Sequence, residues 1–181
     1  MAETTINKSI LNKNNFRLLI DKVPTVEYYV KSVNIPSITF AEATMQAGVG
    51  IDAYFPGDKI EFGTLDVSFL VDEDLQNFKE LYDWMDAIVP FRDPSKYKAY
   101  TSSSSTNPYE QSSNTGNDLL TTSMVTLVVN TNKNIPNKYI RFHDAFPISL
   151  GGLSFESGAE SETISVDASF RFAYYEIEST S

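Results

Sequence analysis

The end of the chain carries the pattern that most narrows the possible folds. Over residues 163–178, apolar and polar residues alternate with a period of two. The apolar set consists of Ile164, Val166, Ala168, Phe170, Phe172 and Tyr174, and the polar set of Ser165, Asp167, Ser169 and Arg171. Such alternation is typical of a β-strand with one buried and one exposed face. Because an isolated strand or hairpin is marginal in water, the pattern predicts a larger sheet.

Six further segments are rich in β-branched and aromatic residues and are bounded by turn residues. They span residues 15–21, 26–34, 64–71, 122–131, 138–144 and 145–149. This composition is typical of strands, and Pro24 marks a turn between the first two segments. In the third segment, Leu65, Val67 and Phe69 fall on one face. Counted with the hairpin described next, the chain has seven to nine predicted strands.

Residues 37–60 predict a long β-hairpin. The stretch from Gln46 to Gly50 is typical of a turn, and the arms lie near residues 38–44 and 51–55. The alternation in the arms is loose, so the hairpin lacks apolar partners of its own and would be marginal alone. We therefore weigh two interpretations, an ordinary surface hairpin and a contact with another subunit, and favour the second.

Residues 74–89 predict one amphipathic helix. Apolar residues recur at helical spacing and form one face: Leu75, Phe78, Leu81, Tyr82, Met85 and Ile88. Asp72 or Asp74 can cap the first turn, where acidic groups suit the positive end of the helix dipole. Pro90 ends the helix. We expect Trp84 to lie either over the apolar face or at a contact.

These elements predict a mainly β fold. We expect an antiparallel β-sandwich or partly closed barrel with one flanking α-helix and a long protruding hairpin. The 181 residues fit one domain. Residues 1–14 are expected to form a flexible arm, and residues 92–118, rich in Ser, Thr and Asn, a surface loop. Deleting residues 101–117 should leave folding intact, because these side chains supply little apolar area.

The composition excludes several kinds of chemistry. The chain has no cysteine, so disulfides, thiolate catalysis and zinc–thiolate sites are ruled out. Its net charge of −10 disfavours direct adhesion to nucleic acid. It has one histidine, His143, beside Asp144 and without a plausible nucleophile nearby, so we interpret it as a polar residue at a strand end. We expect no catalytic site and no enzyme activity.

No cofactor or metal site is expected either. The acidic pair Asp72/Asp74 has a simpler role at the helix start, and the pair Glu160/Glu162 lacks the glycine and spaced acids of a calcium loop. The glycine pairs Gly48/Gly50 and Gly151/Gly152 do not open helices, as a phosphate-binding loop would. No apolar run is long enough to span a bilayer, and the N-terminus lacks a signal core, so we expect cytoplasmic synthesis.

The order of the elements resembles that of a known family. Pro56-Gly57-Asp58 leads to a strand over residues 65–71 and then to an acid-capped helix ending in Tyr82-Asp83-Trp84-Met85. Near the C-terminus, Phe146-Pro147-Ile148-Ser149 precedes Leu153-Ser154-Phe155, a polar turn and the last strand. This arrangement resembles the tail tube proteins of contractile-tailed phages and the related proteins that join the tube to the baseplate. The resemblance covers residues 15–90 and 122–178; the arm and the Ser-rich loop depart from the simplest members.

The resemblance implies a structural subunit of a myovirus tail tube. Such subunits form hexameric rings, stacked into a hollow tube of the virion, through which DNA passes during ejection. Strands of neighbouring subunits continue one another around the lumen, which closes exposed sheet edges. Tail sheath and baseplate proteins are the implied partners, assembly takes place in the host cytoplasm, and no membrane is involved. Some acidic residues would line the lumen and keep DNA from adhering.

The implied contact between rings is made by the hairpin. The apolar residues that would be buried there are Ile38, Phe40, Met45, Val49, Ile51 and Phe55.

Three classes of function stay open at this point. The first is the tail tube protein or the tube–baseplate junction protein. The second is the inner tube subunit of a bacterial contractile injection system, such as a type VI secretion apparatus or a tailocin. The third is an unrelated β-sandwich binding module, for example for carbohydrate, for which Tyr97, Tyr100 and Tyr109 would be the argument.

Overall fold

A computed structural model describes residues 10–89, 122–157 and 163–179 of the protein. The predicted loop at 92–118, the pair Glu160/Glu162 and most of the predicted arm lie outside these residues. The described elements, in chain order, are β1 (Phe16–Ile20), the 3-10 helix η1 (Pro24–Tyr29), β2 (Val30–Asn34), β3 (Ile38–Gly48), β4 (Ile51–Phe62), β5 (Leu65–Leu70), α1 (Gln76–Ile88), β6 (Ser123–Asn130), β7 (Pro136–Leu150), β8 (Ser165–Arg171) and β9 (Tyr174–Ser179).

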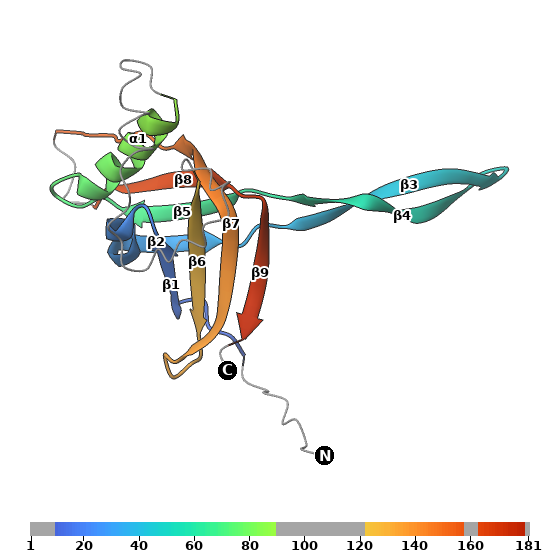
Figure 1. The fold of residues 1–181 in the computed structure, drawn as a ribbon, viewed down its shortest axis with the longest axis horizontal. Helices are drawn as coiled ribbons and strands as arrows, with labels where there is room; N and C mark the ends of the chain where they lie inside the picture. The colour runs from blue at the N-terminus through green and yellow to red at the C-terminus, as the bar shows by residue number, and fades with distance from the viewer. Residues whose placement is uncertain (1–9, 90–121, 158–162, 180–181) are drawn as a thin grey trace, which may run out of the picture.

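The body of the protein is a bent antiparallel sheet. Its strand order is β1-β6-β7-β8-β5-β2, with β9 also paired to β7 (Figure 1). One layer contains β1, β6, β9 and the first part of β7, and the other contains β2, β5, β8 and the end of β7. The mainly β fold with partial closure and one flanking helix, predicted from the sequence, is confirmed.

The core fills the space between the two layers. Apolar side chains with almost no exposure come from β1, β5, β6, β7 and β8 and include Leu18, Leu65, Phe69, Val125, Phe142 and Phe170. Leu65, Val67 and Phe69 lie on one buried face of β5, as the alternation predicts. Hydrophobic burial of this kind is the main favourable contribution to folding.

The predicted C-terminal strand is interrupted. β8 ends at Arg171 and β9 begins at Tyr174, so Phe172 and Ala173 separate two strands in place of one. β8 pairs with β5 and with the end of β7, whereas β9 pairs only with the first part of β7. The chain bends here because the two halves belong to different layers. Asp144, at the corresponding point of β7, has a φ of 54°.

Two other strand predictions need correction. The segment predicted as a strand over residues 26–34 begins as the 3-10 helix η1, and only Val30–Asn34 pairs with β5. The segments 138–144 and 145–149, predicted as separate strands, form the single strand β7. In both regions the residue composition correctly indicates strand residues. It does not determine which backbone groups form hydrogen bonds with a neighbouring strand.

The helix α1 covers one end of the sheet, near β7 and η1 (Figure 1). Leu81 and Trp84 are buried, and the Trp84 ring lies 6.1 Å from that of Phe170. Trp84 is thus a core residue. Leu75 and Tyr82, predicted on the apolar face, are exposed. The N-cap residue is Leu75, whose side chain makes no capping hydrogen bond. Asp72, three residues earlier, accepts a hydrogen bond of 2.7 Å from the Gln76 amide and so satisfies one amide group of the first turn.

The hairpin of β3 and β4 projects from the body (Figure 1). It continues the chain between β2 and β5 and forms a separate two-stranded sheet. Its arms have 11 and 12 residues, so they are longer than predicted and extend roughly 36–40 Å at about 3.3 Å per residue. The turn is Val49–Gly50, and Gly50 has a φ of 84°, which glycine adopts without strain.

Candidate assembly surface

The hairpin exposes an unusual amount of apolar surface. All six residues predicted at a subunit contact are exposed: Ile38, Phe40, Met45, Val49, Ile51 and Phe55. Phe40 retains 67% of its accessible surface and Ile51 69%. Single exposed apolar residues are normal on a protein surface, but contiguous apolar patches mark sites of interaction.

The strand register divides the hairpin into two segments. The basal segment pairs residues 38–40 with 60–62, and the distal segment pairs residues 42–48 with 51–56. A bulge separates them: two steps along β3, from Phe40 to Glu42, correspond to four steps along β4, from Ile60 to Pro56. The bulge is a point at which the alternation of side chains can change.

Each segment has one apolar face. In the basal segment this face carries Ile38, Phe40, Ile60 and Phe62, and the opposite face carries Thr39 and Glu61. In the distal segment the apolar face carries Ala43, Met45, Ile51, Ala53 and Phe55, and the opposite face carries Glu42, Thr44, Gln46, Asp52 and Tyr54. The alternation that looks loose in the sequence is therefore regular within each segment up to Gln46, where a second register shift precedes the turn.

Gly57 allows the two strands to approach closely at the bulge. A Cβ atom at this position would lie 2.4 Å from the carbonyl oxygen and 2.8 Å from the carbonyl carbon of Ala41. Both are backbone atoms, so a larger residue would push the strands apart. The motif Pro56-Gly57-Asp58, noted in the sequence as a turn, is part of this bulge inside β4.

The layer that continues into the hairpin has a polar outer face. Asp66 and Ser68 of β5 lie opposite Ser169 and Asp167 of β8 in the register, and Ser169 donates a hydrogen bond of 2.7 Å to Asp66. Their neighbours in each strand point into the core. At the base of the hairpin, Arg171 donates a hydrogen bond of 3.2 Å to the Phe62 carbonyl.

His143 lies on the outer face of the other layer. Its ring stacks on that of Tyr174 with centroids 4.5 Å apart, and its Nε2 atom is buried 3.8 Å from a Glu176 carboxylate oxygen. Asp144, its neighbour in the sequence, is exposed at the bend of β7. His143 thus lies within β7 and faces the paired strand β9, and not at a strand end as the sequence predicts.

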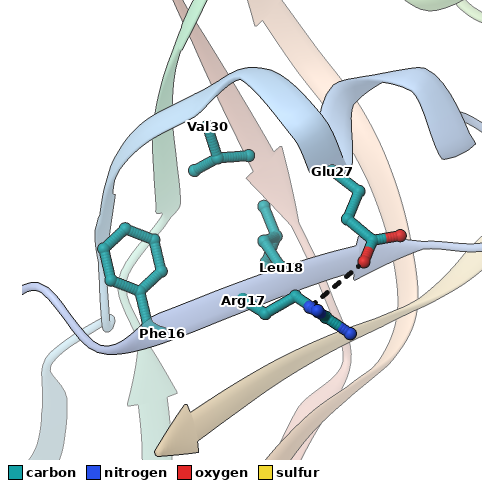
Figure 2. Close-up of a pocket in the computed structure, with 5 residues that line it drawn as sticks. All are labelled: Phe16, Arg17, Leu18, Glu27 and Val30. Carbon is teal, nitrogen blue, oxygen red and sulfur yellow. Dashed lines mark ion pairs between the residues drawn. The ribbon is translucent and has the colours of Figure 1, made fainter. Parts of the chain in front are cut away.

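A small open pocket lies between β1 and η1 (Figure 2). It has a volume of about 190 Å³ and is lined by Phe16, Arg17, Leu18, Glu27 and Val30. Arg17 and Glu27 form an ion pair of 3.3 Å across it. The pocket is smaller than usual ligand sites of about 300–1,000 Å³. We assign it no ligand.

The described residues form neither a cluster suited to a metal ion nor a membrane-spanning helix. Within residues 10–89, 122–157 and 163–179, no group of three or more His, Asp or Glu side chains is placed to hold a metal ion. In the same part of the chain, no helix has the length and apolar character needed to cross a bilayer.

Comparison with known families identifies the kind of protein. The sequence profile of the family described as phage tail tube protein matches residues 3–178. This chain belongs to the phage tail tube protein family. The resemblance seen in the sequence is confirmed, and the family is one of structural tube proteins. The match includes the hairpin and both layers of the sheet, so it concerns the whole described fold.

Solved structures show the same fold at low sequence identity. A chain of the sheath–tube complex of the PVC extracellular contractile injection system, in its extended state, superimposes with a TM-score of 0.57 at 13% identity, covering 96% of this chain and 95% of that chain. The sheath/tube terminator of the same kind of system gives 0.56 at 15%, covering 96% and 99%. The tube-terminating cap of the anti-feeding prophage gives 0.56 at 14%, covering 99% and 100%.

A comparison with curated protein sequences found no match to this chain. Membership of the family takes the place of the unrelated binding module considered from the sequence. The residues that argued for that module, Tyr97, Tyr100 and Tyr109, lie outside the described residues.

Proposed function

We propose that this protein is the structural subunit of a phage tail tube. Copies form hexameric rings, the rings stack into a hollow tube of the virion tail, and DNA passes through the lumen without specific binding. The tail sheath surrounds the tube and the baseplate ends it. The observation that carries this proposal is the projecting hairpin, which exposes apolar residues along both arms and has no covering layer in the described chain.

The hairpin residues Ile38, Phe40, Met45, Val49, Ile51 and Phe55 make the contact between copies in this proposal. Phe40, Met45 and Ile51 keep 67%, 59% and 69% of their accessible surface on a hairpin that projects from the body (Figure 1), so their own chain leaves them largely uncovered. Burial of this area in an assembly would contribute a favourable free energy of roughly 25 cal/mol per Å² of apolar surface.

The sheet edges support lateral assembly. Within the described residues, β2 pairs only with β5, and β9 pairs only with β7. Each therefore has one side whose backbone groups lack a strand partner in this part of the chain. Exposed edges of this kind join other strands readily, and a closed ring of subunits removes them.

A second assembly role is compatible with the same surface. The fold also occurs in a tube-terminating cap and in the tube of an extracellular contractile injection system. In this second role, copies of the protein form a single ring at the tube–baseplate junction, or they form the tube of a bacterial injection system. A junction protein would form rings that do not extend into tubes on their own.

Electron microscopy of the purified protein over a range of concentrations tests the proposal. We expect rings at low concentration and stacked tubes at high concentration. Rings that never stack would favour the junction role. A protein that stays monomeric at high concentration by light scattering, with no rings or tubes, would contradict the proposed function.

The double variant Val49→Asp/Ile51→Asp tests the contact directly. Both residues are exposed in the single chain, so the variant monomer should keep the circular dichroism spectrum and melting temperature of the wild type. In a stack, each new carboxylate would be buried without a partner, at a cost of several kcal/mol when burial is complete, and tubes should be lost. Unimpaired stacking would show that the turn is solvated in the assembly.

A further inference from the structure

The hairpin joins the body through two short connections. Residues 35–37 link β2 to β3, and residues 63–64 link β4 to β5. The two connections lie side by side, because the Gly63 amide donates a hydrogen bond of 3.0 Å to the Ser37 carbonyl. β3 and β4 form a two-stranded sheet that is separate from the seven-stranded sheet of the body. The direction in which the hairpin projects therefore depends on the contacts at its base.

Phe62, the last residue of β4, places its ring against the body. The centroid of this ring lies 5.7 Å from that of Phe172 and 5.5 Å from that of Tyr175. These two rings lie 5.1 and 5.4 Å from the ring of Phe142, which is buried in the core. Tilted and edge-on arrangements at such distances are favourable for aromatic rings. Phe62, Phe172, Tyr175 and Phe142 thus form an aromatic cluster that connects the hairpin to the core.

The aromatic cluster lies where the chain passes from one layer of the sheet to the other. Phe172 belongs to the bend between β8 and β9, and Tyr175 is the second residue of β9. Arg171, the last residue of β8, donates a hydrogen bond of 3.2 Å to the Phe62 carbonyl. The base of the hairpin therefore contacts both layers at one place, beside the start of β9 (Figure 1).

We infer that Phe62 is a positioning residue, through which the aromatic cluster holds the hairpin in one direction relative to the body and links its order to that of β9. A two-stranded ribbon without a core has little rigidity of its own, so a joint at its base decides where its far end lies. Within the described residues, β9 pairs with β7 alone, so the ring contacts of Tyr175 contribute to holding it in place.

This joint is a property of the single chain, whether or not copies assemble as proposed. For the proposed assembly, a hairpin that is already held in one direction has less freedom to lose on docking, which favours binding.

The distance between two spin labels measures the direction of the hairpin. The wild-type chain has no cysteine, so labels attach only at introduced positions. Thr44→Cys on the hairpin and Lys79→Cys on α1 replace exposed residues. Pulsed electron paramagnetic resonance gives the distribution of label distances in a solution dilute enough for light scattering to show single chains. Phe62→Ala removes the ring from the joint, and Ile60→Ala, an exposed position on the same arm, is the control.

The expected result is a change at Phe62 alone. The distribution should be narrow in the labelled parent chain and in Ile60→Ala. In Phe62→Ala it should become wider by about twofold or more, because the hairpin then moves about its two connections. Hydrogen exchange at the β9 amides should become about tenfold faster in the same variant, since β9 loses part of its support. A role in stability alone would lower the melting temperature and leave the distribution narrow.

The other outcomes are distinguishable. A narrow distribution in Phe62→Ala would show that the two connections set the direction, and would overturn the inference. Equal widening in Ile60→Ala would place the motion within the ribbon, with the same consequence. Widening without faster exchange in β9 would support the joint and overturn its link to β9. Should Phe62→Ala not fold, Phe62→Leu keeps most of the apolar volume without the ring, and a narrow distribution in that variant would likewise overturn the inference.

Discussion

At the scale of single residues, Asn77 links the helix to the sheet. It is fully buried, its amide donates a hydrogen bond of 2.7 Å to the Leu70 carbonyl, and its side-chain oxygen accepts one of 2.8 Å from the Phe78 amide. The side chain thus satisfies backbone groups at the end of β5 and at the start of α1. A buried polar side chain needs such partners, because an unmade hydrogen bond leaves the cost of its desolvation.

The substitution Asn77→Asp should destabilise the fold. The new side chain keeps nearly the same shape, but as a carboxylate it cannot donate to the Leu70 carbonyl. We expect a loss of about 1–3 kcal/mol or more in the free energy of unfolding, measured by urea denaturation at neutral pH. The control Asp74→Asn changes an exposed residue of the neighbouring loop and should alter stability by no more than about 0.5 kcal/mol. Equal effects of the two substitutions would contradict this role of Asn77.

His143 offers a second test at this scale. Its stacking on Tyr174 needs an aromatic ring but not the buried Nε2 atom, which lacks a hydrogen-bond partner. His143→Phe should therefore leave the free energy of unfolding unchanged or raise it by up to about 1 kcal/mol, because a buried nitrogen without a hydrogen bond is removed. The melting temperature should change in the same direction. His143→Ala, which also removes the ring, should lower it. A clear loss with Phe would show that the nitrogen has a role that packing does not explain.

At the scale of elements, the bulge in the hairpin has the clearest consequence. It shifts the register between the two arms by two residues and depends on the close approach of Gly57 to the backbone of Ala41. If the proposed function holds, we expect the bulge to affect assembly and not folding, since the hairpin forms a sheet of its own outside the two layers of the body. Bulges that redirect side chains are common where a strand serves a function.

The substitution Gly57→Ala should impair tube formation without affecting the body. The added Cβ would lie 2.4 Å from the Ala41 carbonyl oxygen, so the arms must move apart at the bulge. We expect fewer or shorter tubes by electron microscopy and a melting temperature close to the wild type. Gly48→Ala is the matched control, because a Cβ at Gly48 meets no atom within 4 Å. Normal tubes from Gly57→Ala would show that the bulge geometry is not required.

At the scale of the whole molecule, the protein consists of a body with a full core and a hairpin without one. The buried apolar residues belong to the two layers, to α1 and to the segment that contains η1. Most large apolar residues of β3 and β4 are exposed, with Phe62 at the base as a partly buried exception. We therefore expect the stability of the monomer and the proposed assembly into tubes to depend on different surfaces. The charge of −10 fits a channel that does not retain DNA, since like charges repel.

Removal of the hairpin should separate these two properties. Thr39 and Glu61 are directly opposite in the register, so residues 40–60 can be replaced by Asn-Gly, which favours a two-residue turn. We expect the shortened chain to fold, with a cooperative melting transition near that of the wild type, and to form no stacked tubes. A chain that fails to fold would show that the body needs the hairpin, and stacking without it would place the contact elsewhere.

Much of this fold could be predicted from local sequence. The alternation in β5 and β8, the helical spacing before Pro90 and the small residues around Gly50 are properties of neighbouring residues, and each identifies an element wherever it lies in space. The order of these elements was sufficient to recognise the tail tube family. The exposed apolar residues of the hairpin could also be predicted from the sequence, because a long hairpin without apolar partners in its own chain needs another subunit to cover them. Their contact with another copy stays a prediction.

The tertiary structure alone decided how these elements meet. The bend at Phe172 and Ala173, the burial of Trp84 and the start of β2 after η1 depend on partners that are distant in the chain. The pairing within the hairpin is decided in the same way. Ile38 lies opposite Phe62 and Met45 lies opposite Ala53, on two sides of a bulge whose position follows from the pairing between the arms. Strand register is set by pairing and twist between strands, which the local pattern of either strand does not contain.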